Sequence, residues 1–97
     1  MNNNTLESKK TEAKISVETK LSGDDTIYTL KSKKGQFEVI GKGDGSLLIS
    51  TSAKTMNSAI GGRGEDNGEN AWITDKHCRS NSEAVSIVLE LLMVISE

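Results

Sequence analysis

Apolar and polar residues alternate along residues 13–53, and polar segments containing glycine interrupt the alternation at three points. A period of two is typical of strands with one buried and one solvated face. The pattern predicts four strands, over residues 13–21, 26–33, 36–41 and 46–53. Because the connecting segments are short and polar, we expect the strands to form an antiparallel meander.

The three turns suggest registers that agree about which side chains share a face. The expected closing pairs are Leu21 with Thr26, Lys33 with Gln36, and Gly41 with Leu47. A slip of one residue would move a strand's side chains to the other face, so the agreement supports the meander. The residues expected on the apolar face are Ile15, Val17, Tyr28, Leu30, Phe37, Val39, Leu47 and Ile49.

The C-terminal segment predicts a helix. Ser80 and Glu83 have the spacing of a capping box directly before an apolar run, and polar residues interrupt that run only along one narrow stripe. A helix this apolar needs a second cover besides the sheet, from residues 54–70, from Trp72 or from another copy of the chain. A buried strand is the alternative, because the run is rich in β-branched residues. The residues expected to mediate homodimerisation are Val88, Leu91, Leu92 and Ile95.

The remaining segments complete the expected fold. Residues 1–12 are polar and predict a disordered lead-in. Residues 54–70 contain four glycines and predict a long flexible loop, and residues 71–74 predict a short fifth strand. The sequence therefore predicts one α+β domain over residues 13–97. It has a four- to five-stranded antiparallel β-meander with one C-terminal helix packed on its apolar face.

Composition narrows the class of protein. The chain has 97 residues, of which 3% are aromatic, and a net charge of -2. This charge balance is not that of a basic nucleic-acid-binding chain, and no run is long enough to suggest a membrane span. The shortage of aromatic residues predicts marginal stability for a lone monomer, which a partner or a second copy would relieve. Cys78 is the only cysteine, which excludes an intramolecular disulfide and favours a cytoplasmic location.

The residue types that carry chemistry are scarce. His77 and Cys78 could supply two metal ligands, whereas a structural zinc site needs four. The glycine-rich run 61–64 does not match a phosphate-binding loop, and acidic residues follow it. We therefore expect no enzymatic activity, no cofactor and no metal.

Two surfaces are candidates for binding a partner. The first is the loop, where the expected contact residues are Arg63, Glu65, Asp66 and Glu69. The second is the sheet face away from the helix, where a small apolar patch is ringed by lysines; its residues are Lys20, Ile27, Lys31, Ile40, Lys42 and Leu48. Solvated strand lysines that discourage edge pairing are the simpler interpretation of the lysines.

These surfaces favour a small non-enzymatic protein-interaction module that binds and blocks a protein partner. Inhibitors and immunity proteins, including those encoded by mobile elements or phages, belong to this class. One alternative is a nucleic-acid-associated protein that uses the lysine-rich sheet face, although no aromatic residue is expected there to stack on bases. The other is a structural, self-assembling subunit that uses the C-terminal helix.

Overall fold

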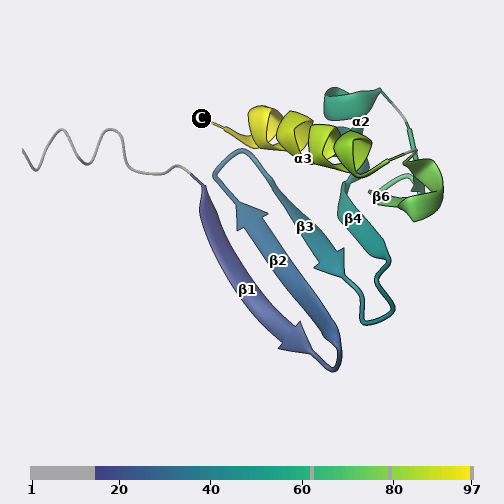
Figure 1. Cartoon of the computed structure of the whole chain (residues 1–97). Coiled ribbons are helices and arrows are strands. Elements are labelled where there is room, and N and C mark those ends of the chain that lie inside the picture. The colour runs from purple at the N-terminus through teal and green to yellow at the C-terminus, as the bar shows by residue number, and fades with distance from the viewer. Residues whose placement is uncertain (1–14, 62, 79, 97) are drawn as a thin grey trace, which may run out of the picture.

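A computed structural model describes residues 15–61, 63–78 and 80–96, so the lead-in predicted for residues 1–12 lies outside the described residues. The described chain forms one open antiparallel sheet of six strands with two helices, which confirms the α+β class (Figure 1). The strand order is β1-β2-β3-β4-β6-β5. The strands are β1 (Ser16–Ser22), β2 (Asp25–Lys31), β3 (Gln36–Gly41), β4 (Leu47–Ser52), β5 (Glu65–Asp66) and β6 (Asn70–Thr74).

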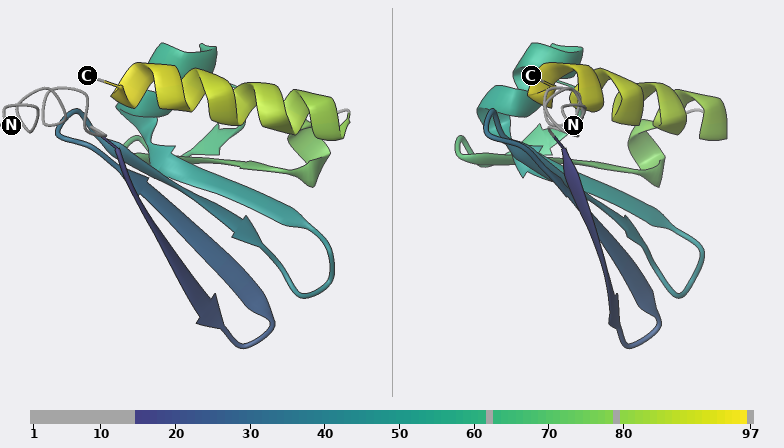
Figure 2. Two further views of the ribbon diagram at one scale, coloured as in Figure 1. Left: turned by 60° about the vertical axis from the view of Figure 1, so that its left-hand side comes forward. Right: turned by 90° about the vertical axis from the view of Figure 1, so that its left-hand side faces the viewer.

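Both helices lie on the same face of the sheet. These are α2 (Ala53–Ile60) and α3 (Asn81–Ile95), and a short 3₁₀ turn, η1 (Asp75–His77), precedes α3. Figure 2 shows that the helices lie over one end of the sheet, that the β1–β2 hairpin extends beyond them, and that no described segment covers the opposite face. No helix among the described residues is long and apolar enough to cross a membrane.

The predicted C-terminal helix is confirmed as α3. The Ser80 hydroxyl accepts a hydrogen bond from the Glu83 backbone N–H at 3.2 Å, which is the expected N-cap. Residues spaced by four along the helix, Ile87, Leu91 and Ile95, are buried against the sheet and α2. Helix α2 therefore supplies the second cover that the apolar run of α3 requires.

The segment 54–70, expected as a long flexible loop, instead begins with helix α2. The Ser52 hydroxyl caps its N-terminus, and Gly61, in the left-handed conformation at φ +68°, ends it. Met56 and Ile60 are spaced by four and contact the core from one face of the helix. The glycines of this segment all follow the helix.

The edge of the sheet adds a sixth strand to the four or five expected. The predicted fifth strand is β6, which pairs with β4, and β5 pairs with β6. Strand β5 consists of Glu65 and Asp66 alone. Two polar residues have no alternation to detect, which is why the sequence did not predict this strand.

Two of the three predicted registers are confirmed, those of β1 with β2 and of β3 with β4. The prediction for β2 with β3 was wrong by two residues, because Lys31 rather than Lys33 lies opposite Gln36. The connecting loop is longer than expected and is closed by a hydrogen bond of 2.8 Å from the Ser32 N–H to the Gly35 carbonyl. A slip of two residues keeps every side chain on its predicted face.

The hydrophobic core lies beneath the helices and reaches the β1–β2 hairpin only at its base, where Ile15 and Leu30 are partly buried against it. Its buried apolar residues are Phe37, Ile49, Met56, Ala71, Ile73, Ile87, Leu91 and Ile95. Val17 and Tyr28 lie on the predicted apolar face, but their exposed fractions are 59% and 42%. The helices cover β3, β4 and β6, and they leave the apolar face of β1 and part of β2 open to solvent.

Candidate functional site

The uncovered sheet face carries an apolar row across its centre. Successive strands from β1 to β6 place five residues directly opposite one another: Lys20, Ile27, Ile40, Leu48 and Thr74. The structure thus brings together the three apolar residues that the sequence singled out on this face. They are half-buried, because each is flanked by its cross-strand neighbours.

Trp72 joins this face, which corrects the expectation that the face lacks an aromatic residue. Ala71 and Ile73 are buried under the helices, so Trp72 between them points to the other side. It lies opposite Ser50, diagonally beside Leu48. The alternation of residues 71–73 contains this signal. The face on which Trp72 lies can be predicted only when β6 is known to pair with β4 in the central sheet.

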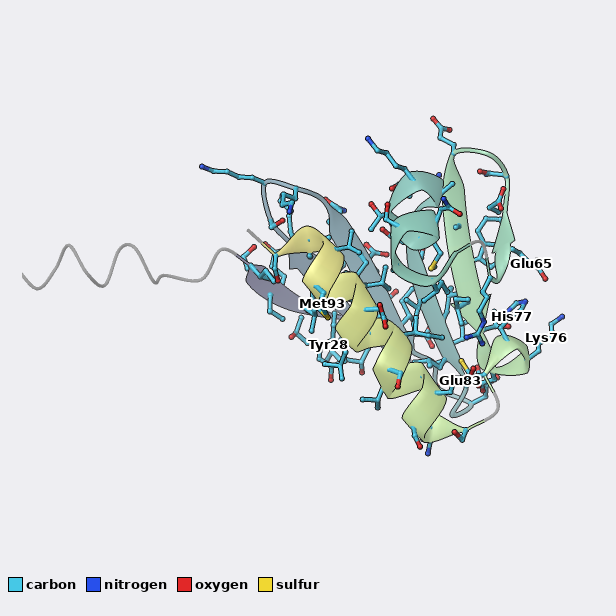
Figure 3. The ribbon with its side chains drawn as sticks, turned by 90° about the horizontal axis from the view of Figure 1, so that it is seen from above. Tyr28, Glu65, Lys76, His77, Glu83 and Met93 are labelled. Atoms are coloured by element: carbon cyan, nitrogen blue, oxygen red, sulfur yellow. The ribbon has the colours of Figure 1, made fainter. Side chains whose placement is uncertain are left out.

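A groove of about 640 Å³ opens beside Leu48 and Trp72, with Lys42, Asp75 and Lys76 among its lining residues. The Asp75 carboxylate accepts a hydrogen bond from the Leu47 N–H at 3.1 Å, which turns that acid toward the backbone. Lys42 and Lys76 are exposed, and neither has an ion-pair partner within the described ranges. In Figure 3 the Lys76 side chain extends outward from η1. The groove therefore combines an apolar floor with two exposed cations at its rim, of which Lys42 also lies in the field of the Asp44 carboxylate.

Arg63, expected as a contact residue for a partner, makes contacts inside the fold, and its side chain is 43% exposed. Its guanidinium donates to the Glu83 carboxylate at 2.7 Å and to the His77 carbonyl at 2.9 Å. These contacts tie the chain before β5 to η1 and to the first turn of α3.

The three acidic residues predicted with Arg63 lie along the exposed β5–β6 edge. The Glu65 carboxylate lies 3.7 Å from His77 Nε2, and an Asp66 oxygen accepts the Gly68 N–H at 3.0 Å. The Glu69 side chain is exposed, while its carbonyl accepts from the Ala53 N–H. These residues do not line the groove with Lys42 and Trp72, although Glu65 lies directly opposite Trp72 and so adjoins the uncovered face.

The residues predicted for self-association lie mostly inside the monomer. Leu91 and Ile95 are fully buried, and Val88 and Leu92 are partly buried against the same core. The apolar surface that α3 leaves to solvent consists of other residues, namely Val85, Leu89 and Met93.

The His77 ring is hydrogen-bonded to the backbone, and the Cys78 thiol beside it is partly buried. The Thr74 N–H donates to His77 Nδ1 at 3.0 Å, which occupies one ring nitrogen. Burial, together with the nearby Glu83 carboxylate, raises the pKa of the Cys78 thiol, and this lowers its thiolate fraction at neutral pH. Within the described ranges, no three His, Cys, Asp or Glu side chains are grouped so that they could hold a metal ion.

A comparison with protein-family models, curated proteins and solved structures finds no match to this chain.

Proposed function

We propose that this chain is a small, non-enzymatic protein-interaction module that binds and blocks a protein partner through its uncovered sheet face. The observation that carries the proposal is the apolar row that runs into a groove beside Trp72. Tryptophan is enriched among the residues that dominate binding energy, and an apolar centre with a charged rim is the usual anatomy of an interface.

The groove also indicates the chemistry of the partner. Leu48 and Trp72 offer a site for one apolar side chain, and Lys42 and Lys76 offer two cations to carboxylates beside it. We therefore propose an acidic protein segment with an apolar anchor. Contacts between opposite charges at the rim would act mainly on the association rate and on specificity.

Nucleic acid fits this face less well. Trp72 provides a single aromatic platform, and single-strand binders stack successive bases on several. Glu65 lies directly opposite Trp72, and Glu38 lies in the same cross-strand row. A phosphate backbone that follows the row would meet both carboxylates, whereas the proposed acidic segment needs contact only with the groove at Lys42 and Lys76, which neither carboxylate lines.

The blocking role and the cytoplasmic location belong to the same proposal. An inhibitor or immunity protein acts by occupying a surface, which a sheet face of this kind can do without moving. The lone Cys78, partly buried and held as a thiol, suits a reducing compartment. Homodimerisation is compatible with this function, because the exposed stripe Val85, Leu89 and Met93 lies on the opposite face from the groove.

The test is affinity capture from lysate of the native host with the whole chain as bait. We expect one protein to be retained stoichiometrically after nuclease treatment. The double variant Lys42→Glu/Lys76→Glu should lose this protein, because both rim cations would then repel its carboxylates. The matched control Lys34→Glu/Lys54→Glu makes the same change in net charge at exposed lysines away from the groove and should retain it.

The captured protein, once purified, allows the affinity and the blocking role to be measured separately. Titration calorimetry should show weaker binding at raised salt, and the partner's own activity should fall as the complex saturates. Equal capture by both double variants would refute the groove as the binding site. Recovery of nucleic acid alone, lost on nuclease treatment, would favour the lysine-rich face as a phosphate-binding surface instead.

A further inference from the structure

Strand β1 forms one edge of the sheet and lacks a partner on its outer side among the described residues. All seven of its residues are exposed, and it pairs only with β2. Figure 2 shows the strand at the free edge, with no helix beside it. Alternate N–H and C=O groups of such a strand point outward and can pair with another extended chain.

The sequence of β1 is complementary to itself when it is reversed about Thr19. Antiparallel pairing with a second copy about a twofold axis at this residue places Glu18 opposite Lys20 of the second copy. The same pairing places Val17 opposite Leu21 and Ser16 opposite Ser22. Every one of the seven residues then faces a residue of matching or complementary kind.

The charges on β1 also select this register over its neighbours. If the apolar faces of both copies are to lie on the same side, odd-numbered residues must oppose odd-numbered ones. Among such registers, only three leave at least five of the seven residues paired, and they centre on Glu18, Thr19 or Lys20. The outer two oppose Glu18 to itself or Lys20 to itself, which is destabilising, so the register centred on Thr19 is favoured.

An exposed apolar surface continues from this edge toward α3. Val17 and Leu21 are 59% and 74% exposed, and neighbouring Tyr28 on β2 is 42% exposed. The stripe Val85, Leu89 and Met93 is exposed on α3, and Met93 lies on the same side of that helix as Tyr28 (Figure 3). Pairing through β1 would join the exposed apolar surfaces that Val17, Leu21 and Tyr28 form in each copy. The exposed apolar residues of the two α3 helices would lie on either side of this joint surface. Contiguous apolar surface of this kind marks an interaction site.

We propose that two copies of this chain dimerise by antiparallel pairing of their β1 strands about Thr19. The two six-stranded sheets would then form one continuous sheet of twelve strands. The opposite edge is β5, which has only two residues, both acidic, and offers little for further pairing. The assembly therefore closes as a symmetric dimer and does not grow into a fibre.

The proposal does not rest on the function proposed for the uncovered face. Pairing at β1 uses the edge of that strand, with Val17 and Leu21 on the face that bears the helices and Glu18 and Lys20 on the uncovered face, while the groove of Trp72 opens beside β4 and β6. The dimer would present two such grooves on one side of a continuous sheet. A partner with two binding segments would then be held more tightly than by either groove alone.

The test is sedimentation equilibrium of the full chain and of charge variants of β1. We expect a monomer–dimer equilibrium for the native chain. The single variants Lys20→Glu and Glu18→Lys should each raise the dissociation constant about tenfold, because both symmetry-related pairs would become repulsive. Mixing the two variants, or combining both substitutions in one chain, should restore dimerisation, since every pair is then again of opposite charge.

The control Lys54→Glu makes the same charge change at an exposed position of α2, away from β1, and should leave the dissociation constant unchanged. Restoration by the charge swap separates pairing from any effect of one substitution on folding. A native chain that stays monomeric at high micromolar concentration would overturn the proposal. A dimer whose dissociation constant is unchanged by the β1 charge variants, but that is lost in Met93→Glu, would also overturn the proposal, because the interface would then lie on α3.

Discussion

The Arg63 guanidinium lies 2.7 Å from the Glu83 carboxylate and donates a second hydrogen bond to the His77 carbonyl. Glu83 is in the first turn of α3, where a negative charge is favoured by the helix dipole. One side chain thus joins the segment before β5, the turn η1 and the start of α3. The residue that the sequence offered as a partner contact acts as a connection between elements of the fold.

Replacing Arg63 by methionine should lower the free energy of unfolding by about 1 kcal/mol, because a partly exposed ion pair and a hydrogen bond are lost. Urea denaturation measures this change. Lys54→Met is the matched control, since Lys54 is exposed on α2, and should leave stability within about 0.5 kcal/mol. Unchanged stability in Arg63→Met together with lost partner capture would return Arg63 to a binding role.

Two leucines of α3, two positions apart, should respond very differently to truncation. Leu91 is fully buried, whereas Leu89 is 54% exposed. We expect Leu91→Ala to cost about 2–5 kcal/mol through the cavity it leaves, and Leu89→Ala to cost less than about 1 kcal/mol. Thermal and urea unfolding at low micromolar protein concentration compare the two. Similar losses for both would mean that α3 is rotated from the orientation described.

The strands and α3 were predictable because their signals are local. Period-two alternation specifies each strand, and the Ser80 cap with its apolar run specifies the helix. The error between β2 and β3 arose because Ser32 and Gly35 close a four-residue loop, where the sequence suggested a two-residue turn. Helix α2 was missed because the glycines after it dominated the composition of its segment and obscured the spacing of Met56 and Ile60.

The candidate site was predictable only in part, because its remaining members depend on contacts between distant segments. The row Ile27, Ile40 and Leu48 follows from neighbouring hairpins. Trp72 reaches the same face through the pairing of β6 with β4, across an intervening helix. The exposure of Val17 depends on how far the helices extend over the sheet. The alternation within one strand carries no information about that extent.

The Ser32 hydroxyl donates a hydrogen bond of 2.6 Å to the Ile95 carbonyl and so fastens the end of α3 to the β2–β3 loop. Carbonyls in the last turn of a helix lack partners within the helix, so this bond satisfies one of them. Ser32→Ala should lower the free energy of unfolding by about 1 kcal/mol and speed amide exchange in the last turn. Ser86→Ala, on the exposed side of α3, should show neither effect. Equal exchange rates in the two variants would rule out this anchoring role.

Cys78 should titrate at higher pH in the folded chain than in the unfolded one, because burial and the Glu83 carboxylate raise the pKa of its thiol. The contribution of this group to stability is therefore present below the unfolded pKa and is lost as the pH rises through the folded pKa. The rate of alkylation by iodoacetamide, followed against pH, reports the thiolate fraction.

The same titration in concentrated urea provides the reference for the unfolded chain, and its midpoint should lie below that of the folded chain. Glu83→Gln should move the folded midpoint toward the reference, because one neighbouring negative charge is removed. Glu90→Gln, on the exposed side of the same helix, is the matched control and should leave the midpoint unchanged. A folded midpoint at or below the unfolded one would contradict the structure around Cys78 and would favour a reactive thiol at this position.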